Sequence, residues 1–251
     1  MFDLSGKTAL VTGSGRGIGL VLARGLAKAG ARVAVNDLRD DIVGAARETL
    51  RRDGIEAAGA AFDVTDREAV REGIDRLERD VAPLDILVNN AGIHRRAPLA
   101  EMSAEDWRLV IETNLTSAFL VGQRAVRGMI ARRSGKIINI CSLNCELPRP
   151  SIGNYAAAKG GLVLLTRSMT VEWARHNIQI NGIAPGYILT EMTKPLYEDP
   201  EKNAWIIGRT PAERWGRPEE LVGAAVFLAS AEADFVNGHV LFVDGGMRVA
   251  L

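Results

Sequence analysis

The stretch Lys7-Thr-Ala-Leu-Val-Thr12, followed directly by Gly13-Ser-Gly15-Arg-Gly17-Ile-Gly19, decides the fold predicted for this chain. The first six residues are typical of a short buried strand, and a helical pattern begins at Gly17. Doubly wound folds bind a pyrophosphate at such a turn, because its backbone N–H groups can approach the phosphates. The spacing departs from Gly-x-Gly-x-x-Gly, since Ile18 stands at the place of the third glycine. We predict a dinucleotide site here, with a purely structural turn as the alternative.

Outward from this stretch, short apolar runs alternate with helical patterns along the chain. Strands are predicted at 7–12, 32–37, 57–63, 84–89, 136–142, 178–184 and 240–244. Helices are predicted at 17–29, 41–53, 66–80, 104–132, 155–176 and 218–229. The strands lack the alternation of a half-wet sheet, which favours parallel strands covered on both faces. The expected fold is α/β: a Rossmann-type, doubly wound three-layer sandwich with a seven-stranded parallel sheet and right-handed crossovers.

Composition narrows the possible classes of protein. The 251 residues fit a single domain spanning 1–251. Lys plus Arg and Asp plus Glu both number 31, which argues against nucleic acid or an anionic membrane as a partner. The chain carries no secretory signal pattern and no apolar run long enough to span a bilayer, so we expect a cytoplasmic protein. Two cysteines and three histidines are too few and too scattered to predict a metal site.

A long connection follows the sixth predicted strand. It runs from about residue 186 to 215 and holds Pro195 and Pro200 among polar and apolar residues. Connections of this length are uncommon in compact domains and often cover a binding site. We expect a substrate lid there, with an ungated surface excursion as the alternative.

The end of the second predicted strand bears on the choice of nucleotide. Asp37 can accept hydrogen bonds from the ribose hydroxyls and would repel a 2′-phosphate, which favours NAD. Arg16 and Arg39 point the other way, because a guanidinium pairs well with phosphate, unless both are solvated surface charges. The cofactor is therefore expected to be NAD or NADP, with a slight preference for NAD and with dual use open.

A hydroxyl, a phenol and an ammonium are spaced for acid–base chemistry in the second half of the chain. Ser142 precedes Tyr155 by thirteen residues, and Lys159 follows one helical turn after Tyr155. A cation about 4 Å from a phenol supplies on the order of 4 kcal/mol at an effective dielectric of ~20. That is enough to lower a pKa near ~10 by about three units. Taken alone, the pair is more simply a surface Tyr and Lys, and the remaining motifs decide between these interpretations.

Together these motifs resemble the short-chain dehydrogenase/reductase family over essentially the whole length. The marks are Thr12-Gly13-x-x-x-Gly17-x-Gly19, Asn89-Asn90-Ala91-Gly92, Asn114, Ser142, Tyr155-x-x-x-Lys159 and Pro185-Gly186. The resemblance implies a catalytic tetrad of Asn114, Ser142, Tyr155 and Lys159. Ser142 would hold the substrate oxygen and Tyr155 would exchange a proton with it. Lys159 would lower the pKa of the tyrosine and hold the nicotinamide ribose, and Asn114 would position a water.

The resemblance also implies a set of cofactor contacts. In the order of the chain they are Gly13, Gly15, Arg16, Gly17, Ile18, Gly19, Asp37, Asp63, Val64, Asn90, Tyr155, Lys159, Pro185, Gly186, Ile188 and Thr190. Asp63 and Val64 would contact the adenine, and Asn90 would border the adenosine ribose. Ile188 and Thr190 would clamp the nicotinamide amide. In the family, long helices such as 104–132 and 155–176 pair across subunits, so a homotetramer is implied.

Several segments are similar to the gluconate 5-dehydrogenase subgroup, which implies a sugar-acid substrate reacting at C5. These are 92–98, 139–147, 176–179, 209–216 and 235–246. Arg95 or Arg96 would hold the substrate carboxylate, while Glu146 and Arg149, with Ser142, would contact the sugar. For Arg95 and Arg96 the alternative is a pair of solvated loop residues or a subunit contact. For Glu146 and Arg149 it is salt bridging within the loop. Another sugar acid, a polyol or a 3-oxoacyl thioester is the alternative substrate, and a non-catalytic nucleotide sensor is the remaining alternative function.

Overall fold

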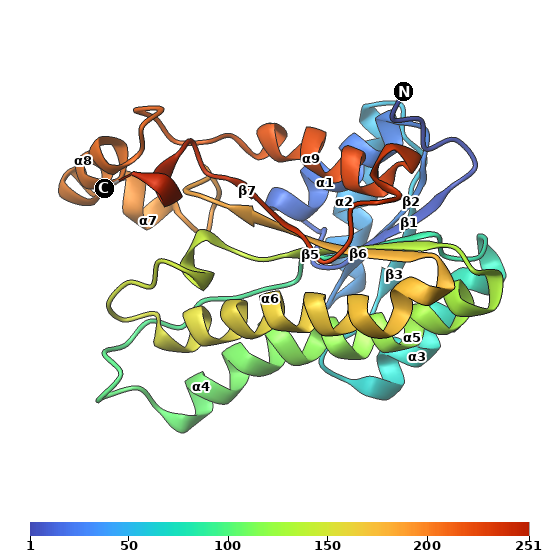
Figure 1. Cartoon of the computed structure of the whole chain (residues 1–251), viewed down its shortest axis with the longest axis horizontal. Helices are drawn as coiled ribbons and strands as arrows, with labels where there is room; N and C mark the ends of the chain where they lie inside the picture. Colours follow the sequence, from blue (N-terminus) through green and yellow to red (C-terminus); the bar gives the residue numbers. More distant parts are fainter. Residues whose placement is uncertain (251) are drawn as a thin grey trace.

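A central parallel sheet organises the molecule, which is a computed structural model describing residues 1–250 (Figure 1). Its seven strands lie in the order β3-β2-β1-β4-β5-β6-β7. The strands are β1 (Thr8–Val11), β2 (Arg32–Asp37), β3 (Ala58–Ala61), β4 (Ile86–Asn89), β5 (Gly135–Ile140), β6 (Ile178–Pro185) and β7 (Val240–Val243). The order reverses direction between β1 and β4, where ligands bind in doubly wound sheets.

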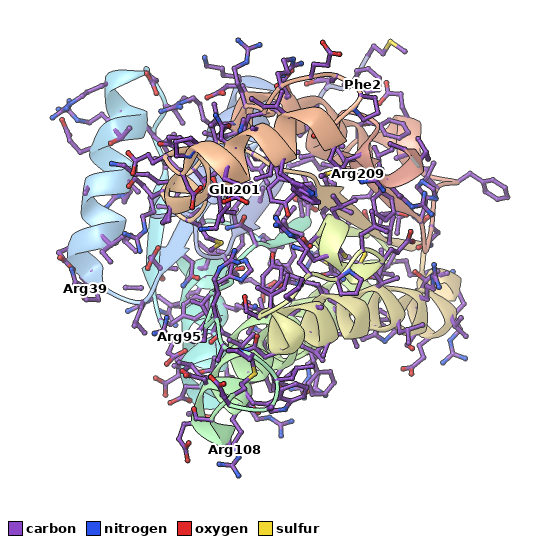
Figure 2. All side chains as sticks on the ribbon, turned by 90° about the vertical axis from the view of Figure 1, so that its left-hand side faces the viewer. Phe2, Arg39, Arg95, Arg108, Glu201 and Arg209 are labelled. Atoms are coloured by element: carbon purple, nitrogen blue, oxygen red, sulfur yellow. The ribbon has the colours of Figure 1, made fainter. Side chains whose placement is uncertain are left out.

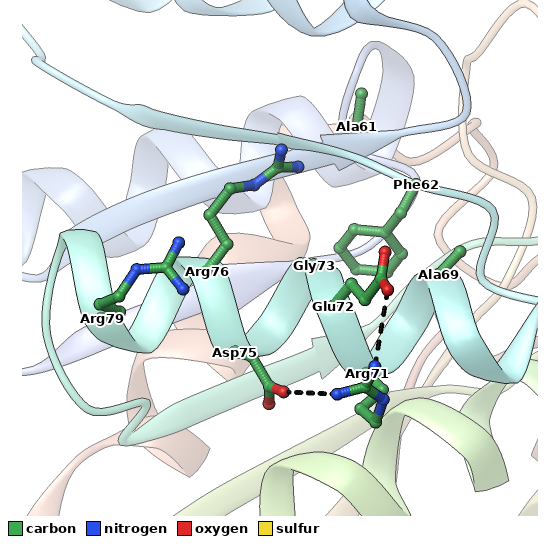
Figure 3. Close-up of a pocket in the computed structure, with 9 residues that line it drawn as sticks. All are labelled: Ala61, Phe62, Ala69, Arg71, Glu72, Gly73, Asp75, Arg76 and Arg79. Atoms are coloured by element: carbon green, nitrogen blue, oxygen red, sulfur yellow. Dashed lines mark hydrogen bonds and ion pairs between the residues drawn. The ribbon is translucent and has the colours of Figure 1, made fainter.

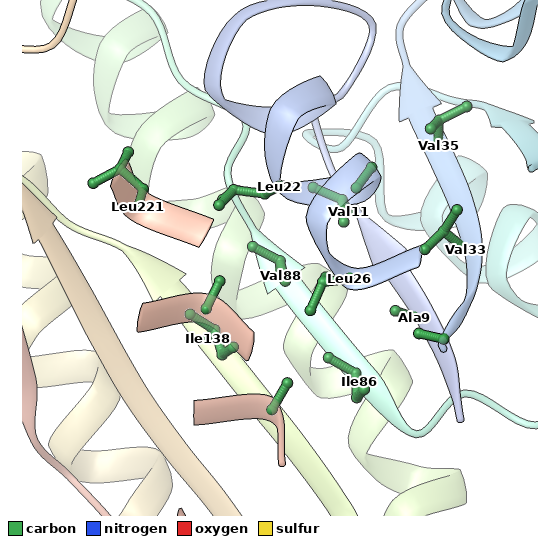
Figure 4. Packing of buried hydrophobic residues seen from close by; sticks show 14 of the residues in the cluster. Ala9, Val11, Leu22, Leu26, Val33, Val35, Ile86, Val88, Ile138 and Leu221 are labelled. Atoms are coloured by element: carbon green, nitrogen blue, oxygen red, sulfur yellow. The ribbon is translucent and has the colours of Figure 1, made fainter. Parts of the chain in front are cut away.

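Helices cover both faces of the sheet (Figure 1). They are α1 (Gly17–Lys28), α2 (Asp40–Arg52), α3 (Arg67–Asp80), α4 (Ala104–Ile111), α5 (Ser117–Arg132), α6 (Gly153–Trp173), α7 (Lys194–Tyr197), α8 (Pro200–Arg209) and α9 (Val222–Ala229). One buried cluster joins the sheet to α1, α2 and α9, and Figure 4 shows Leu22 and Leu26 of α1 packed over Val88 of β4. A second cluster joins the other face to α3, α5 and α6. The predicted three-layer α/β fold is therefore confirmed.

The structure differs from the predicted elements in the lid and in one long helix. The stretch predicted as one helix, 104–132, is divided into α4 and α5 by a π-helical segment, Glu112–Thr116. The connection after β6 contains the short helix α7 and the ten-residue helix α8, neither of which was predicted. The predicted third strand is two residues shorter at its carboxyl end, and β5 ends at Ile140, so Ser142 lies beyond the strand. Within residues 1–250, none of the helices combines the length and apolar character that a membrane crossing requires.

Candidate active site

Most of the predicted site residues follow the carboxyl ends of the strands and so lie at one edge of the sheet. This edge is on the side of the molecule that faces the viewer in Figure 2. In that view α8, with Glu201 and Arg209 labelled, lies above both Arg95 and α6. Parallel strands bring all their carboxyl ends to one edge, so loops that are distant in sequence meet there. This arrangement places the glycine loop, the tetrad and the lid along one side of the molecule.

The glycine loop leaves the start of α1 open for an anion. Arg16 occupies the N-cap position without making a side-chain capping bond, so the first N–H groups of α1 have no side-chain acceptor. Gly17 has φ +57°, and a Cβ added there would meet no atom within 4 Å. Gly13 has φ +58° and lies against the backbone of Ala91, which a Cβ would approach to 2.7 Å. A backbone that needs glycine, with free N–H groups and open space, fits a bound pyrophosphate.

Asp37 lies beside the glycine loop, where the prediction placed it. One carboxylate oxygen accepts from the N–H of Gly15 at 3.2 Å and the other from Leu38 at 2.8 Å. These bonds hold the carboxylate at the loop and offset part of its charge. Arg39 is exposed and pairs with Asp41 at 2.8 Å, while Arg16 is exposed at the start of α1. This end of the site therefore holds a carboxylate that would repel a 2′-phosphate and guanidinium groups that would attract one.

The residues predicted to contact the adenosine lie next to the loop. Val64 is buried, and Asp63 accepts from the backbone and hydroxyl of Thr65 at 2.8 and 2.7 Å. The side chain of Asn90 donates to the carbonyl oxygens of Thr12 and Gly13 at 2.9 and 3.0 Å. Asn90 therefore also fixes the glycine loop to the end of β4, a bracing contact that the sequence had not indicated.

The segment predicted to clamp the nicotinamide leaves β6 at Pro185. The N–H of Gly186 donates to Val243 at 3.0 Å, and Ile188 is buried and bridges to Gly216. The N–H of Thr190 donates to the hydroxyl of Thr193 at 3.0 Å. The predicted clamp is thus held in place from both the sheet and the lid.

The serine, tyrosine and lysine are brought together as their spacing predicted. Tyr155 and Lys159 lie one turn apart on α6, with the lysine Nζ 5.7 Å from the centre of the phenol ring. Lys159 is buried, and its Nζ donates to the carbonyl of Ile140 at 2.6 Å. Ser142 is also buried and hydrogen-bonds with Tyr155. A hydroxyl, a phenol and an ammonium therefore converge on one point at the end of β5.

Burial dominates the protonation of this centre. It raises the pKa of Tyr155 to about 12, opposed by the hydrogen bond from Ser142. It also lowers the pKa of Lys159 to about 8. The expected depression of the phenol pKa by the lysine is therefore absent from the protein alone, where burial has the largest effect and only Ser142 and Arg96 act against it. At neutral pH the centre holds a protonated phenol, which is ready to donate a proton.

Asn114 braces the loop that follows β4. Its side-chain oxygen accepts from the N–H of Ile93 at 2.7 Å, and its Nδ2 donates to the carbonyl of Ile93 at 2.8 Å. It belongs to the π-helical segment, a local geometry that is frequent at functional sites. Both ends of its amide are thus engaged with the protein, and its part in positioning a water stays a prediction.

A buried polar chain that the sequence had not indicated fixes α6 against the sheet. Asn89 of β4 donates to Asn139 of β5 at 2.9 Å, and Asn139 donates to Thr166 of α6 at 2.8 Å. Such bonds are directional, so they set the rotation of α6 and hence where Tyr155 points. The sequence did carry a signal for this chain of hydrogen bonds, because asparagine is unusual inside an otherwise apolar strand.

The two arginines after β4 have different surroundings. Arg95 lies 3.6 Å from the carboxylate of Asp106 and donates to the carbonyl of His94 at 3.1 Å. Within residues 1–250, Arg96 has no ion-pair partner, and its charge acts on His94 and on the phenol of Tyr155. The structure therefore offers Arg96 as the guanidinium next to the catalytic centre.

Glu146 and Arg149 are engaged with other side chains. Glu146 forms a two-bond ion pair with Arg248, at 2.5 and 3.3 Å, close to the end of the chain. Arg149 donates to the hydroxyl of Tyr187 at 2.7 Å and lies 4.2 Å from the ring centre of Trp205 on α8. Arg149 thus links the loop after β5 to the lid. Arg248 and Trp205 were not predicted, since both are remote in sequence from these partners.

One open groove lies away from this centre. It has a volume of about 500 Å³ and lies along α3 beside Ala61 and Phe62, where Arg71 pairs with Glu72 and Asp75 (Figure 3). None of the predicted site residues lines it. Among residues 1–250, no group of three or more His, Cys, Asp or Glu side chains is placed to hold a metal ion.

A glycine loop that fits a pyrophosphate, on the same edge of the sheet as a Ser–Tyr–Lys centre, is the arrangement expected of a nucleotide-dependent oxidoreductase. Comparison with known proteins agrees: the family model described as enoyl-(acyl carrier protein) reductase matches residues 13–248. The chain belongs to the short-chain dehydrogenase/reductase family of NAD(P)-dependent oxidoreductases.

Two curated relatives and one solved structure are similar over the whole chain. The 5-keto-D-gluconate 5-reductase of Escherichia coli (strain K12) is 53% identical, with 100% of this chain and 99% of the relative covered. The gluconate 5-dehydrogenase of Gluconobacter oxydans is also 53% identical, with 100% and 98% covered. The structure of a gluconate 5-dehydrogenase from Burkholderia cenocepacia in complex with NADP and tartrate has a TM-score of 0.97 and 52% identity, with 100% and 98% covered.

Proposed function

We propose that this protein interconverts D-gluconate and 5-keto-D-gluconate, with NAD(P) as the hydride carrier. The observation that carries the proposal is the guanidinium of Arg96, which has no ion-pair partner among residues 1–250 and whose charge acts on Tyr155. An aldonate presents a carboxylate at one end and a carbinol carbon near the other. A fixed cation beside a proton donor matches both groups. The names of the relatives support the same substrate.

Each member of the centre has a defined part in this reaction. The bound nicotinamide supplies or accepts the hydride, and the substrate oxygen gains or loses a proton in the same step. Ser142 hydrogen-bonds to that oxygen. Tyr155 donates the proton during reduction of the ketone and accepts it during oxidation of the alcohol. Lys159 stabilises the phenolate and binds the nicotinamide ribose.

The cofactor proposal is use of both NAD and NADP. Asp37 favours NAD, but its carboxylate already accepts two backbone N–H groups, which weakens its repulsion of a 2′-phosphate. Arg16 is exposed at the loop and available to a phosphate. Solved relatives hold NADP, so a preference for NAD rests on Asp37 alone.

We extend the proposal to architecture and assembly. The chain forms one domain with a lid over about residues 186–215, which Arg149 holds closed through Tyr187 and Trp205. It works in the cytoplasm, where a reducing environment suits its free thiols. It forms a homotetramer, because α5 and α6 leave Phe119, Leu164 and Val171 exposed for a second copy to cover.

A substrate and cofactor screen tests the proposed reaction. Purified protein is expected to reduce 5-keto-D-gluconate with both NADPH and NADH, because the site holds the groups that hydride and proton transfer require. Initial rates at several concentrations give kcat/KM for each pair. Efficient reduction of polyol-derived ketones or 3-oxoacyl thioesters, without turnover of 5-keto-D-gluconate, would contradict the substrate. Cofactor binding without turnover of any carbonyl would indicate a nucleotide sensor.

Replacing each arginine after β4 tests the carboxylate anchor. Arg96→Ala is expected to raise KM for D-gluconate by about 10- to 150-fold, because a charge-assisted contact contributes roughly 1.5–3 kcal/mol. Arg95→Ala is the matched control and is expected to change KM less than threefold, since Arg95 already faces Asp106. Steady-state kinetics with saturating cofactor measure both. An equal loss in the two variants, or a larger one in Arg95→Ala, would refute the assignment to Arg96.

A further inference from the structure

We infer that His94 is a positioning residue for Tyr155: its ring stacks on the phenol, fixes its orientation and shields one of its faces from water. The inference rests on the proposed function of Tyr155 as the proton donor. The two ring centres lie 3.7 Å apart, with 25° between the ring planes. The residues are 61 positions apart in sequence and reach this contact from the loop after β4 and from α6.

Two buried asparagines hold the backbone on either side of His94. Asn114 binds both the N–H and the carbonyl of Ile93, at 2.7 and 2.8 Å. Asn154 donates to the carbonyl of Arg95 at 3.1 Å and accepts from the N–H of Tyr155 at 2.7 Å. The amide of Asn154 thus joins the loop that carries the imidazole directly to the residue that carries the phenol. The stack is set by fixed backbone rather than by a mobile loop.

The hydrogen bonds of His94 do not account for its position. Its Nδ1 is buried and has no hydrogen-bond partner. Leaving such an atom unpaired is unfavourable, whereas an apolar ring of similar shape would avoid the cost. The imidazole of His94 instead stacks its ring face on the phenol of Tyr155, and such contacts between aromatic rings are stabilising.

The charges around the stack keep the imidazole neutral. Burial lowers the pKa of His94 to about 4, and the charges of Arg96 and Lys159 act in the same direction. A neutral ring adds no positive charge beside the phenol, so its effect on Tyr155 is through geometry and exclusion of water. Around Tyr155 itself, Ser142 and Arg96 favour the phenolate, while burial and the neighbouring thiols of Cys141 and Cys145 oppose it.

Two substitutions separate ring stacking from hydrogen bonding by the imidazole. His94→Ala removes the ring, and His94→Phe keeps a ring without nitrogen atoms. His94→Ala is expected to lower kcat about tenfold with less than a threefold change in KM, because the loss falls on the step that uses the oriented phenol. His94→Phe is expected to keep kcat within about threefold of the wild-type value. The substrate is whichever carbonyl compound the wild-type protein reduces best, so the test stands even if gluconate is not the substrate.

A second measurement does not depend on turnover. Ultraviolet titration of the three tyrosines follows the ionisation of the phenols directly. In His94→Ala, more water reaches the phenol, which is already partly exposed in the wild-type protein, so the pKa of Tyr155 is expected to fall below about 12. In His94→Phe it is expected to remain unchanged. The same titration of Tyr155→Phe identifies which of the three transitions belongs to Tyr155.

The outcomes distinguish the inference from its alternatives. Circular dichroism and binding of NADPH first verify that each variant is folded, since we expect neither measurement to depend on the His94 side chain. Equal losses in His94→Phe and His94→Ala with a raised KM would mean that the imidazole contacts the substrate and would overturn a stacking role. A normal kcat in His94→Ala, or an unchanged titration, would overturn it too. A wild-type protein that turns over no carbonyl refutes the proposed function, while a shifted titration would still place His94 as the shield of the phenol.

Discussion

Tyr155→Phe is expected to lower kcat by about 10³-fold or more while the affinity for NADPH stays within about threefold. A positioned acid–base group contributes roughly 10²–10⁴-fold, and the phenol is the proton donor of this centre. The ring remains and keeps its contact with His94, so the substitution removes the reacting oxygen alone. Stopped-flow or steady-state rates with either cofactor measure kcat, and fluorescence titration measures binding.

The pH dependence provides a second expected result for the same variant. The pKa of Tyr155 lies at about 12 in the protein alone, so the phenol is protonated at neutral pH and oxidation of the alcohol should accelerate as pH rises. Tyr155→Phe should lose this rise together with the rate. Tyr197→Phe is the matched control, a loss of one hydroxyl on α7 that should keep the rise of the rate with pH. Near-normal kcat in Tyr155→Phe would refute the assigned role.

The fold was predictable because its signals are local. The run from Lys7 to Gly19 combines a buried strand, a turn that needs glycine and a helix start within thirteen residues. The pairing of Tyr155 with Lys159 follows from helical spacing alone, and the lysine Nζ does lie 5.7 Å from the phenol ring. The predicted parallel sheet and the proximity of Tyr155 and Lys159 depend on such local signals, and both are present in the structure.

The helices of the lid were missed although a signal was present. Pro195 and Pro200 are typical of an irregular connection, but Pro200 is the first residue of α8 and Asp199 caps that helix. Proline is favoured at this position because the first N–H groups of a helix have no partner within it. The π-helical segment at Glu112–Thr116 carried no such signal, because an apolar stripe does not distinguish one extra residue in a turn.

The remaining features of the site depend on contacts between residues that are distant in the sequence, which local patterns do not predict. Glu146 and Arg248 are 102 residues apart, and their ion pair occupies a carboxylate that was predicted to bind sugar. His94 was not predicted at all, since only the folded loop brings it onto Tyr155. The sign of the shift in the phenol pKa was also wrong for the protein alone. Its cause is desolvation, a property of the assembled site that charge spacing does not report.

Lys159→Met is expected to lower kcat by about 10²-fold and, at neutral pH, to raise the melting temperature. Catalysis is lost because the lysine Nζ lies 5.7 Å from the centre of the phenol ring, where a cation supplies on the order of 3 kcal/mol toward the phenolate at an effective dielectric of ~20. Stability rises because the buried ammonium is unfavourable to folding: a pKa lowered from 10.5 to about 8 corresponds to about 3 kcal/mol. The carbonyl of Ile140 loses its donor, which offsets about 1–3 kcal/mol. A net gain of about 1 kcal/mol raises Tm by roughly 2–4 °C.

The gain in stability should also vanish in a defined range of pH. Between about 8 and 10.5 the unfolded lysine is protonated and the folded one is not, so the unfolded state binds more protons. The free energy of unfolding of the wild-type protein therefore rises with pH across this window. Below it the cost of the buried cation is fully present. Calorimetry is expected to show the largest difference between Lys159→Met and wild type at pH 7, shrinking steadily toward pH 9.5, before the ionisation of tyrosine intervenes.

Lys136→Met is the matched control for this prediction. Lys136 is also largely shielded from water, but its Nζ pairs with Asp234 at 2.5 Å, and it lies near the start of β5, away from the carboxyl edge. Its removal leaves a carboxylate without its partner, so it should not stabilise the protein, and turnover should be unchanged.

A Lys159→Met protein that melts several degrees below wild type at pH 7 would contradict an unfavourable buried ammonium. Retention of wild-type turnover would contradict its action on Tyr155. The two measurements are independent, so the same side chain can be shown to oppose folding while it supports catalysis.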